Sequence, residues 1–539
     1  MTTALEWKDV RITYRTARSE SGEIAAVDGV SLAIEAGGTV GIAGESGCGK
    51  STLAMSVLRL LPRNAEISGS IELAGEDTGS MRWGRLRAVR WTEAAIVFQG
   101  AMHSLNPVRT VGRQIVEALE LHGGKDSTKE SRAARVAELL ALVELPAARA
   151  ESYPHELSGG QKQRVMIAMA LACDPDVIIA DEPTTALDVV IQAQVLDVLS
   201  GLVRDRQLTL MMISHDLSVL AAVCERIVVM RDGRIVEQGP AHDVITNPQH
   251  EHTRELAAAF PIIGDPGSRF APGSPTAGDE QSSGPLLEVE DLVVDFHARG
   301  RHTRAVDHVS MACHPGEIVA LVGQSGSGKT TLARTILGLQ RPTSGRISYQ
   351  GRPMPTDRAG LKAYRRTVQF VLQDPSASLN PKHSVYEAVA EGIRIHRLPG
   401  DEAERVARAL TQAELTPPER FLGAIPQELS GGQRQRVVIA GALALEPSFL
   451  VADEPVASLD ASVRGEILAL LLQLKRDLGL GALVITHDLG LAWNIADRVL
   501  VMHQGKIVES GPVEQVLLEP AHDYTKTLLK VVPSKLGQS

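Results

Sequence analysis

Two glycine-rich stretches decide the fold of this chain, Gly44-Glu45-Ser46-Gly47-Cys48-Gly49-Lys50-Ser51 and Gly323-Gln324-Ser325-Gly326-Ser327-Gly328-Lys329-Thr330. Both fit the pattern G-x-x-x-x-G-K-[ST], in which backbone N–H groups wrap around phosphates at the start of a helix. The lysine is expected to reach the β- and γ-phosphates, and the final hydroxyl to bind Mg²⁺. Thr52 and Thr331, which follow, are expected to complete each nucleotide site. A glycine-rich turn with an incidental lysine is the alternative interpretation.

Further short motifs occur twice, in the same order. They are Leu157-Ser158-Gly159-Gly160-Gln161 and Leu429-Ser430-Gly431-Gly432-Gln433, Asp181-Glu182-Pro183 and Asp453-Glu454-Pro455, and Ser214-His215-Asp216 and Thr486-His487-Asp488. These three pairs are all separated by 272 positions, the two lysines by 279, and Gln99 and Gln373 by 274. A constant separation in the later part, after a small net deletion in the earlier part, indicates a tandem duplication.

This ordered set of five motifs resembles the nucleotide-binding domain of ATP-binding cassette (ABC) proteins, twice over nearly the whole chain. The resemblance implies an α/β fold with two tandem P-loop ATPase domains. Each would have a RecA-like core, an antiparallel β subdomain and a helical signature subdomain. Short apolar runs such as 177–180 and 318–322 precede the motifs and are typical of buried parallel strands. Ligands gather at the carboxyl ends of such strands.

The length of 539 residues is too great for one hydrophobic core, so at least two domains are expected. The first is predicted to cover 1–261 and the second 285–539, each with a C-terminal tail. Residues 262–284 are rich in Gly, Pro and Ser and are predicted to form a flexible linker.

Composition excludes several classes of protein. A net charge of −10 argues against a nucleic-acid surface, and four scattered cysteines favour reduced thiols in the cytoplasm. The N-terminus lacks the pattern of a signal peptide, and no apolar run approaches the ~18–20 residues of a membrane span. If the protein works at a membrane, we expect it to lie peripherally on the cytoplasmic face, with the spans supplied by other chains.

The acidic and histidine motifs predict hydrolysis of ATP. Asp181 and Asp453 are expected to hold Mg²⁺, and the next residues, Glu182 and Glu454, to act as general bases on the attacking water. Solvated or capping acids are the alternative. His215 and His487, at strand ends, are expected to contact the γ-phosphate. Gln99 and Gln373 are expected to sense Mg²⁺ and the γ-phosphate from a mobile loop. Both sites retain the glutamate, so both are expected to be active.

The resemblance also implies that each signature segment serves the nucleotide of the opposite domain. Ser158, Gly160 and Gln161 would face the ATP held by Lys329, while Ser430, Gly432 and Gln433 would face the ATP held by Lys50. Closure would then be an intramolecular head-to-tail pairing, favoured by the tether.

Two aromatic residues stand where the family stacks a ring on adenine. They are Tyr14 and Phe296, which lie 36 and 33 positions before their P-loop lysines. A core residue at a strand end is the alternative for each. Cys48 occupies the P-loop position that Ser327 has in the second copy; a redox switch is conceivable there, and a passive substitution is the favoured interpretation. Irregularly spaced His242, His250 and His252 are predicted to be a solvated surface.

Ser-Leu-Asn-Pro at 104–107 and 378–381, with related tails at 248–253 and 520–525, resembles the oligopeptide/dipeptide/nickel branch of ABC importers. The first tail fits less well, because it has Glu251-His252 where the branch tends to have Pro-Tyr. The branch implies two permease subunits and an extracytoplasmic solute-binding protein as partners. Short peptides are the favoured prediction for the transported solute. Oligosaccharides, nickel complexes, glutathione and opine-like compounds are the alternatives. No iron–sulfur cluster is expected, since no cysteine follows Cys313 or lies between it and Cys224.

A soluble tandem-cassette ATPase that acts on ribosomes is the alternative from another class. Such proteins usually have a long, charged helical linker that reaches RNA. The short Gly/Pro/Ser stretch and the net charge of −10 disfavour this alternative. The sequence therefore predicts the ATPase of a bacterial importer, driven by ATP-dependent closure of its two domains.

Overall fold

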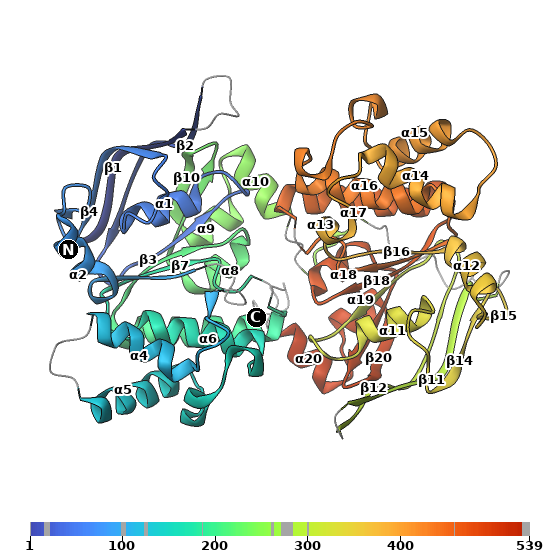
Figure 1. The fold of residues 1–539 in the computed structure, drawn as a ribbon, viewed down its shortest axis with the longest axis horizontal. Helices are drawn as coiled ribbons and strands as arrows, with labels where there is room; N and C mark the ends of the chain where they lie inside the picture. The colour runs from blue at the N-terminus through green and yellow to red at the C-terminus, as the bar shows by residue number, and fades with distance from the viewer. Residues whose placement is uncertain are drawn as a thin grey trace. The chain divides into compact units, whose positions relative to one another are not determined.

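The protein divides into two compact units, residues 1–260 and 261–539 (Figure 1). The structure is a computed structural model that describes residues 2–15, 22–98, 104–122, 128–185, 187–259, 263–270, 284–298, 301–457 and 459–530. Each unit contains a six-stranded sheet, a four-stranded sheet and a group of helices. The predicted fold class is confirmed.

The six-stranded sheet of the first unit has the order β10-β9-β3-β8-β7-β6. Its strands are β3 (Thr39–Ala43), β6 (Ala94–Val97), β7 (Val177–Asp181), β8 (Thr209–Ile213), β9 (Arg226–Arg231) and β10 (Arg234–Pro240). All neighbours run parallel except β9 and β10. Every residue of β3, β7 and β8 is buried, as expected for strands that are mostly apolar and lie inside a parallel sheet. The P-loop, acidic and histidine motifs lie at the carboxyl ends of these strands.

The second sheet of the first unit is antiparallel, with the order β2-β1-β4-β5. Its strands are β1 (Thr3–Arg15), β2 (Glu23–Glu35), β4 (Ala65–Leu73) and β5 (Glu76–Asp77). Trp7 on β1 is 1% exposed, and its indole Nε1 donates to Ser56 Oγ at 3.4 Å. Since Ser56 lies on the helix after the P-loop, this contact joins the sheet to the nucleotide site.

Helices of the first unit separate into two groups. A helical subdomain lies at one end of the unit, away from β1 and β2 (Figure 1), and consists of α4 (Val111–His122), α5 (Lys129–Leu142) and α6 (Gly159–Ala170). The others accompany the sheets and the tail: α1 (Lys50–Val57), α2 (Trp83–Thr92), α7 (Val189–Arg206), α8 (Leu217–Val223), α9 (Ala241–Thr246) and α10 (Glu251–Ala258).

The second unit repeats this plan. Its sheets have the orders β16-β17-β18-β13-β19-β20 and β12-β11-β14-β15. The strands are β11 (Leu287–Ala298), β12 (Arg301–Cys313), β13 (Ile318–Val322), β14 (Ser344–Tyr349), β15 (Arg352–Pro353), β16 (Val368–Val371), β17 (Phe449–Asp453), β18 (Gly481–Thr486), β19 (Arg498–His503) and β20 (Lys506–Pro512). The helices are α11 (Lys329–Ile336), α12 (Arg358–Thr367), α13 (Pro375–Ser378), α14 (Val385–His396), α15 (Glu402–Gln412), α16 (Gly431–Leu443), α17 (Ala461–Leu478), α18 (Leu489–Ile495), α19 (Val513–Leu518) and α20 (Asp523–Leu529).

Part of the expected linker packs on the second unit. Within residues 263–270, the backbone oxygen of Asp265 and the hydroxyl of Ser268 each accept from Trp493 Nε1 at 3.2 Å. The guanidinium of Arg269 lies 5.2 Å from the centre of the Trp493 ring and forms an ion pair with Glu514. We call residues 263–270 the anchor segment. Residues 271–283 lie outside the described part of the chain.

Among the described residues, none of the helices combines the length and the apolarity that crossing a bilayer demands.

Candidate functional site

The two P-loops connect β3 to α1 and β13 to α11. The last glycine of each, Gly49 or Gly328, caps its helix with a φ of 101° or 108°. A Cβ atom at Gly49 would lie 2.1 Å from the backbone oxygen of Ala26, and one at Gly328 would lie 2.2 Å from that of Ala305. No side chain fits at either position. The loops therefore keep bare N–H groups at a helix N-terminus, which is the arrangement that binds phosphate.

Both P-loop lysines are buried and turn back over their loops. Lys50 Nζ donates to the backbone oxygens of Gly44 at 2.8 Å and Glu45 at 2.6 Å. Lys329 Nζ makes the same two bonds, to Gly323 at 2.6 Å and Gln324 at 2.8 Å. A buried ammonium held mainly by carbonyl oxygens gains from an anionic partner, so each cradle fits the phosphates of ATP.

A hydroxyl and a carboxylate meet at each predicted metal site. Ser51 Oγ donates to Asp181 at 3.0 Å, and Thr330 Oγ1 donates to Asp453 at 3.1 Å. Burial raises the pKa of both aspartates, and the hydrogen bond from the hydroxyl opposes that rise. A divalent cation would relieve the cost of burying the carboxylates. Paired oxygen donors of this kind fit Mg²⁺.

The predicted bases, Glu182 and Glu454, directly follow the metal-site aspartates. Each has a left-handed φ, 46° and 48°, and each backbone N–H bonds to the end of the neighbouring strand, at Ile213 or Ile485. Left-handed backbone in a glutamate is uncommon and recurs at functional sites. Because of this turn, the glutamate side chain points in a different direction from the side chain of the preceding aspartate. Two different roles require such a difference.

Each glutamate lies beside its predicted histidine. His487 Nδ1 is 2.7 Å from Glu454 Oε1, whereas the corresponding distance from His215 to Glu182 is 3.5 Å. Burial would raise the pKa of both glutamates, but the hydrogen bond and charge of the histidine outweigh it and lower the pKa. Burial likewise would lower the pKa of His487, but its bond to Glu454 raises it. Both glutamates are therefore held ionised, which is the state that the predicted role of general base requires.

The second glutamine loop reaches the same glutamate. Gln373 Nε2 donates to Glu454 Oε2 at 2.7 Å, so that one carboxylate is shared by a histidine and a loop glutamine. Gln99, its predicted counterpart, lies outside the described residues. In the first unit, Thr185 Oγ1 donates to Glu182 at 2.8 Å.

The predicted adenine-stacking residues lie on the outer antiparallel sheets. The Tyr14 hydroxyl, on β1, is 3.2 Å from the Thr52 hydroxyl at the start of α1, which places Tyr14 beside the first P-loop. Phe296 lies on β11 and is 41% exposed. Such an exposed ring is available to a flat ligand. Stacking on adenine stays a prediction for both.

The signature segments begin α6 and α16 with capping boxes. Ser158 Oγ accepts from Gln161 N at 3.3 Å, while the Gln161 side chain accepts from Ser158 N at 3.1 Å. Ser430 and Gln433 are paired in the same way, at 3.2 Å and 3.0 Å. Both segments thus present an ordered helix N-terminus. That each contacts the ATP held by the other domain stays a prediction.

The glycines within these segments have a packing role as well. A Cβ at Gly160 would lie 2.2 Å from Ile191 Cγ2, and one at Gly432 would lie 2.4 Å from Val463 Cγ1. Ile191 lies on α7 and Val463 on α17. Glycine is therefore needed for the signature helix to approach the next helix closely.

Cys48 and Ser327 occupy equivalent buried places in the two P-loops. Burial raises the pKa of the Cys48 thiol despite the nearby ammonium of Lys50, whose Nζ is 3.7 Å from Sγ. A protonated thiol is a poor nucleophile, which favours a passive substitution over a redox switch. Ser327 Oγ is buried without a hydrogen-bond partner among the described residues.

One contact of the second P-loop was not predicted from the sequence. The hydroxyl of Tyr524, on α20 of the C-terminal tail, accepts from Gln324 N at 3.0 Å, and its ring stacks on His503 at a centroid distance of 3.9 Å. Tyr524 belongs to the second tail, 520–525, for which the sequence predicts no contact with the P-loop. In the first tail, His252 stands in its place. That histidine is 1% exposed, so the prediction that it is solvated is wrong.

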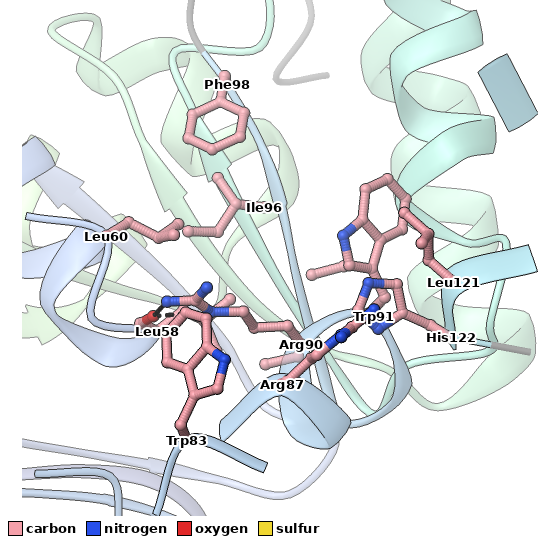
Figure 2. A pocket seen from close by; sticks show the side chains of 12 residues that line it. Leu58, Leu60, Trp83, Arg87, Arg90, Trp91, Ile96, Phe98, Leu121 and His122 are labelled. Carbon is pink, nitrogen blue, oxygen red and sulfur yellow. Dashed lines mark hydrogen bonds between the residues drawn. The ribbon is translucent and has the colours of Figure 1, made fainter. Parts of the chain in front are cut away.

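A groove of about 360 Å³ lies next to the first glutamine loop (Figure 2). It is lined by residues of the turn after α1, of α2, of β6 and the residue after it, and of α4: Leu58, Leu60, Trp83, Arg87, Arg90, Trp91, Ala94, Ala95, Ile96, Phe98, Leu121 and His122. Phe98 directly precedes Gln99, and it is 40% exposed. The groove has walls from both the core and the helical subdomain, so a protein segment bound there would contact both of them.

Comparisons with known proteins agree with this geometry. The family described as "ABC transporter" matches residues 27–185 and 306–457, and the one described as "Oligopeptide/dipeptide transporter, C-terminal region" matches 236–284 and 508–537. The glutathione import ATP-binding protein GsiA of Escherichia coli (strain K12) is 42% identical over 553 residues, which cover 95% of this chain and 87% of that protein. GsiA of Shigella sonnei (strain Ss046) has the same identity and coverage.

Among solved structures, cbiO1 from Clostridium perfringens, part of the ABC transporter complex cbiONQ, is 34% identical. The match has a TM-score of 0.40 and covers 44% of this chain and 91% of that one. Because the family matches recur in both halves and the GsiA relatives align along nearly the full length, the chain belongs to the ABC transporter ATP-binding proteins of the oligopeptide/dipeptide branch, with two cassettes fused in one polypeptide.

Proposed function

We propose that this chain is the ATP-hydrolysing subunit of an importer for short peptides or peptide-like solutes. The observation that carries the proposal is the presence of two full sets of ATPase residues, each followed by an oligopeptide/dipeptide C-terminal region. GsiA, named for glutathione import, supports a solute of di- or tripeptide size. Two permeases and an extracytoplasmic binding protein are the proposed partners, with the chain on the cytoplasmic face of the membrane.

Hydrolysis depends on five residues in each cassette. Lys329 would neutralise the phosphates, while Thr330 and Asp453 would hold Mg²⁺, which supplies charge neutralisation at the γ-phosphate. Glu454 accepts a proton from the attacking water, because its carboxylate is kept ionised by His487. Lys50, Ser51, Asp181, Glu182 and His215 would do the same in the first cassette. No iron–sulfur cluster takes part in this proposal.

The glutamine loops would connect transport to hydrolysis. Gln373 contacts Glu454 directly, so a permease that moves this loop changes the surroundings of the base. In the first cassette the groove beside Phe98 lies where such a permease would contact both subdomains. Each signature segment would complete the other cassette's site on closure. The two cassettes would thus exist in an open and a closed state, and both ATP and the permease would shift the balance between these states.

The test begins with purification of the tagged chain from its own membranes. We expect two permeases to copurify, and we expect ATPase activity to rise when binding protein loaded with a di- or tripeptide is added. Binding protein without peptide is the control. Full ATPase without permeases, together with ATP-dependent cosedimentation with ribosomes, would contradict the proposal and favour the ribosomal alternative.

A further inference from the structure

The two cassettes present different surfaces at equivalent places beside their glutamine loops. The equivalence is fixed by hydrogen bonds as well as by sequence. Arg90 donates to the backbone oxygen of Leu58 at 2.7 Å and 3.1 Å, and Arg365 donates to that of Leu337 at 3.0 Å. We call the surface around Arg90 the first docking surface and that around Arg365 the second.

Both surfaces share an apolar pair and a histidine. Phe98 and Leu121 of the first are 40% and 54% exposed, and their counterparts Leu372 and Ile395 are 41% and 53% exposed. Each surface also has a histidine with a lowered pKa. The histidines are His122, where the causes are burial and the charges of Arg87 and Arg90, and His396, where they are burial and the charges of Lys362 and Arg366. A cationic neighbourhood around exposed apolar side chains suits an amphipathic segment with an acidic residue.

Tryptophans distinguish the first surface from the second. Trp83 is the first residue of α2 and is 66% exposed; the first residue of α12 is Arg358. Trp91 follows Arg90, whereas Arg366 follows Arg365. The first surface therefore has two indoles where the second has two guanidinium groups.

The two indoles are held in place by their neighbours (Figure 2). The Arg90 guanidinium lies 5.2 Å from the centre of the Trp83 ring, and Trp91 stacks on His122 at 6.1 Å with an interplanar angle of 21°. Trp91 has a φ of 75°, because α2 is broken at Arg90 and Trp91. One extra residue in the first cassette accompanies this break: the separation between the copies falls from 275 at Arg90 to 274 at Val97. No such break interrupts α12.

A left-handed backbone at a tryptophan costs free energy, and its persistence points to a binding role for the ring. Tryptophan and arginine are the residues that most often dominate binding at interfaces. The groove of about 360 Å³ is large enough to admit an apolar side chain from a partner.

We propose that the two docking surfaces select two different permease chains. The first surface takes a short cytoplasmic helix that inserts an aromatic or aliphatic side chain between Trp83 and Trp91 and directs a carboxylate to Arg87. The second takes a helix richer in carboxylates, which pair with Lys362, Arg366 and Arg358. This inference rests on the proposed importer function and adds that each cassette of the fused chain has its own assigned permease.

The test uses the full chain in its native membranes, with the photo-crosslinking residue p-benzoylphenylalanine at position 83 or at position 358. Arg204, exposed on α7, is the control position. We expect position 83 to label one permease and position 358 the other, with an acidic residue close to each crosslink. Labelling of the same permease segment from both positions would overturn the inference while leaving the importer function intact. No permease labelling at all would overturn the importer function itself.

Substitution provides an independent test. Trp83→Arg gives the first surface the residue of the second at the exposed start of α2. We expect it to lower copurification of the first permease about tenfold, a typical loss at a dominant interface residue, and to leave the second permease bound. Arg358→Trp should lower only the second. Equal loss of both permeases, or loss of neither, would overturn the assignment. Thermal unfolding of each variant checks that the fold is retained.

Discussion

His487 Nδ1 lies 2.7 Å from Glu454 Oε1 in the second cassette, whereas the equivalent pair in the first, His215 and Glu182, is separated by 3.5 Å. The closer pair is also contacted by Gln373. The two ATP sites are therefore built from the same residues with different internal contacts, and the consequences are measurable.

The ion pair of Glu454 and His487 should make stability depend on pH. The raised pKa of His487 gives a contribution that is full below about pH 6.5 and is lost as pH rises through the raised value. The lowered pKa of Glu454 gives a contribution that is present above about pH 4.5 and is lost as pH falls through the lowered value. We expect His487→Gln to cost about 1.5–3 kcal/mol between these limits and less above them, as measured by denaturant unfolding.

His215→Gln is the matched control, since its longer distance predicts a smaller cost. An equal cost for both variants at every pH would show that the 2.7 Å contact does not stabilise the second cassette.

Both glutamates should be needed for hydrolysis. Glu182→Gln and Glu454→Gln each remove a general base, whose contribution is roughly 100-fold or more at its own site. In the assembled transporter, each single variant should release phosphate much more slowly than the parent. The double variant should retain ATP through gel filtration. Wild-type turnover in either single variant would mean that only the other site is catalytic.

The Tyr524 hydroxyl should strengthen nucleotide binding in the second cassette, because it accepts the N–H of Gln324 within the P-loop. Removing one such bond costs about 0.5–1.5 kcal/mol, so Tyr524→Phe should weaken ATP binding there by up to about tenfold. Titration in a background with Lys50→Ala isolates the second site. Tyr349→Phe is the control, since that hydroxyl has no hydrogen-bond partner among the described residues. Identical losses in the two variants would leave Tyr524 without a special role.

Gly160 should tolerate no side chain, because a Cβ there would lie 2.2 Å from Ile191. Gly160→Ala is expected to destabilise the first cassette by about 1–3 kcal/mol, the usual cost of overpacking. Gly201→Ala, on α7 with open space around its Cβ, should instead stabilise by about 0.5–1 kcal/mol. Ile191→Ala in combination with Gly160→Ala should recover part of the loss. No recovery would mean that the glycine is required for another reason.

Local motifs made much of the site predictable from sequence. A P-loop fixes its own backbone through adjacent glycines. Asp453 ends a strand whose apolar run is recognisable, and Glu454 follows it. The contact between Gln324 and Tyr524 was not predictable, because it joins residues 200 positions apart through the packing of α20. The break at Trp91 depends on one extra residue whose effect on a helix could not be told from composition. The roles of Ser158 and Ser430 across the cassettes stay predictions.

The anchor segment changes where this polypeptide can be cut. Residues 263–270 lie on the second unit through Trp493 and Glu514, although in sequence they directly follow the tail of the first. A break placed within 271–283 would therefore yield two chains, and the first chain would still end with the anchor segment that binds the second unit. Such a split pair should reassemble when the two pieces are expressed separately. A break placed before 263 should not allow it, since the first piece would then lack the residues that Trp493 holds.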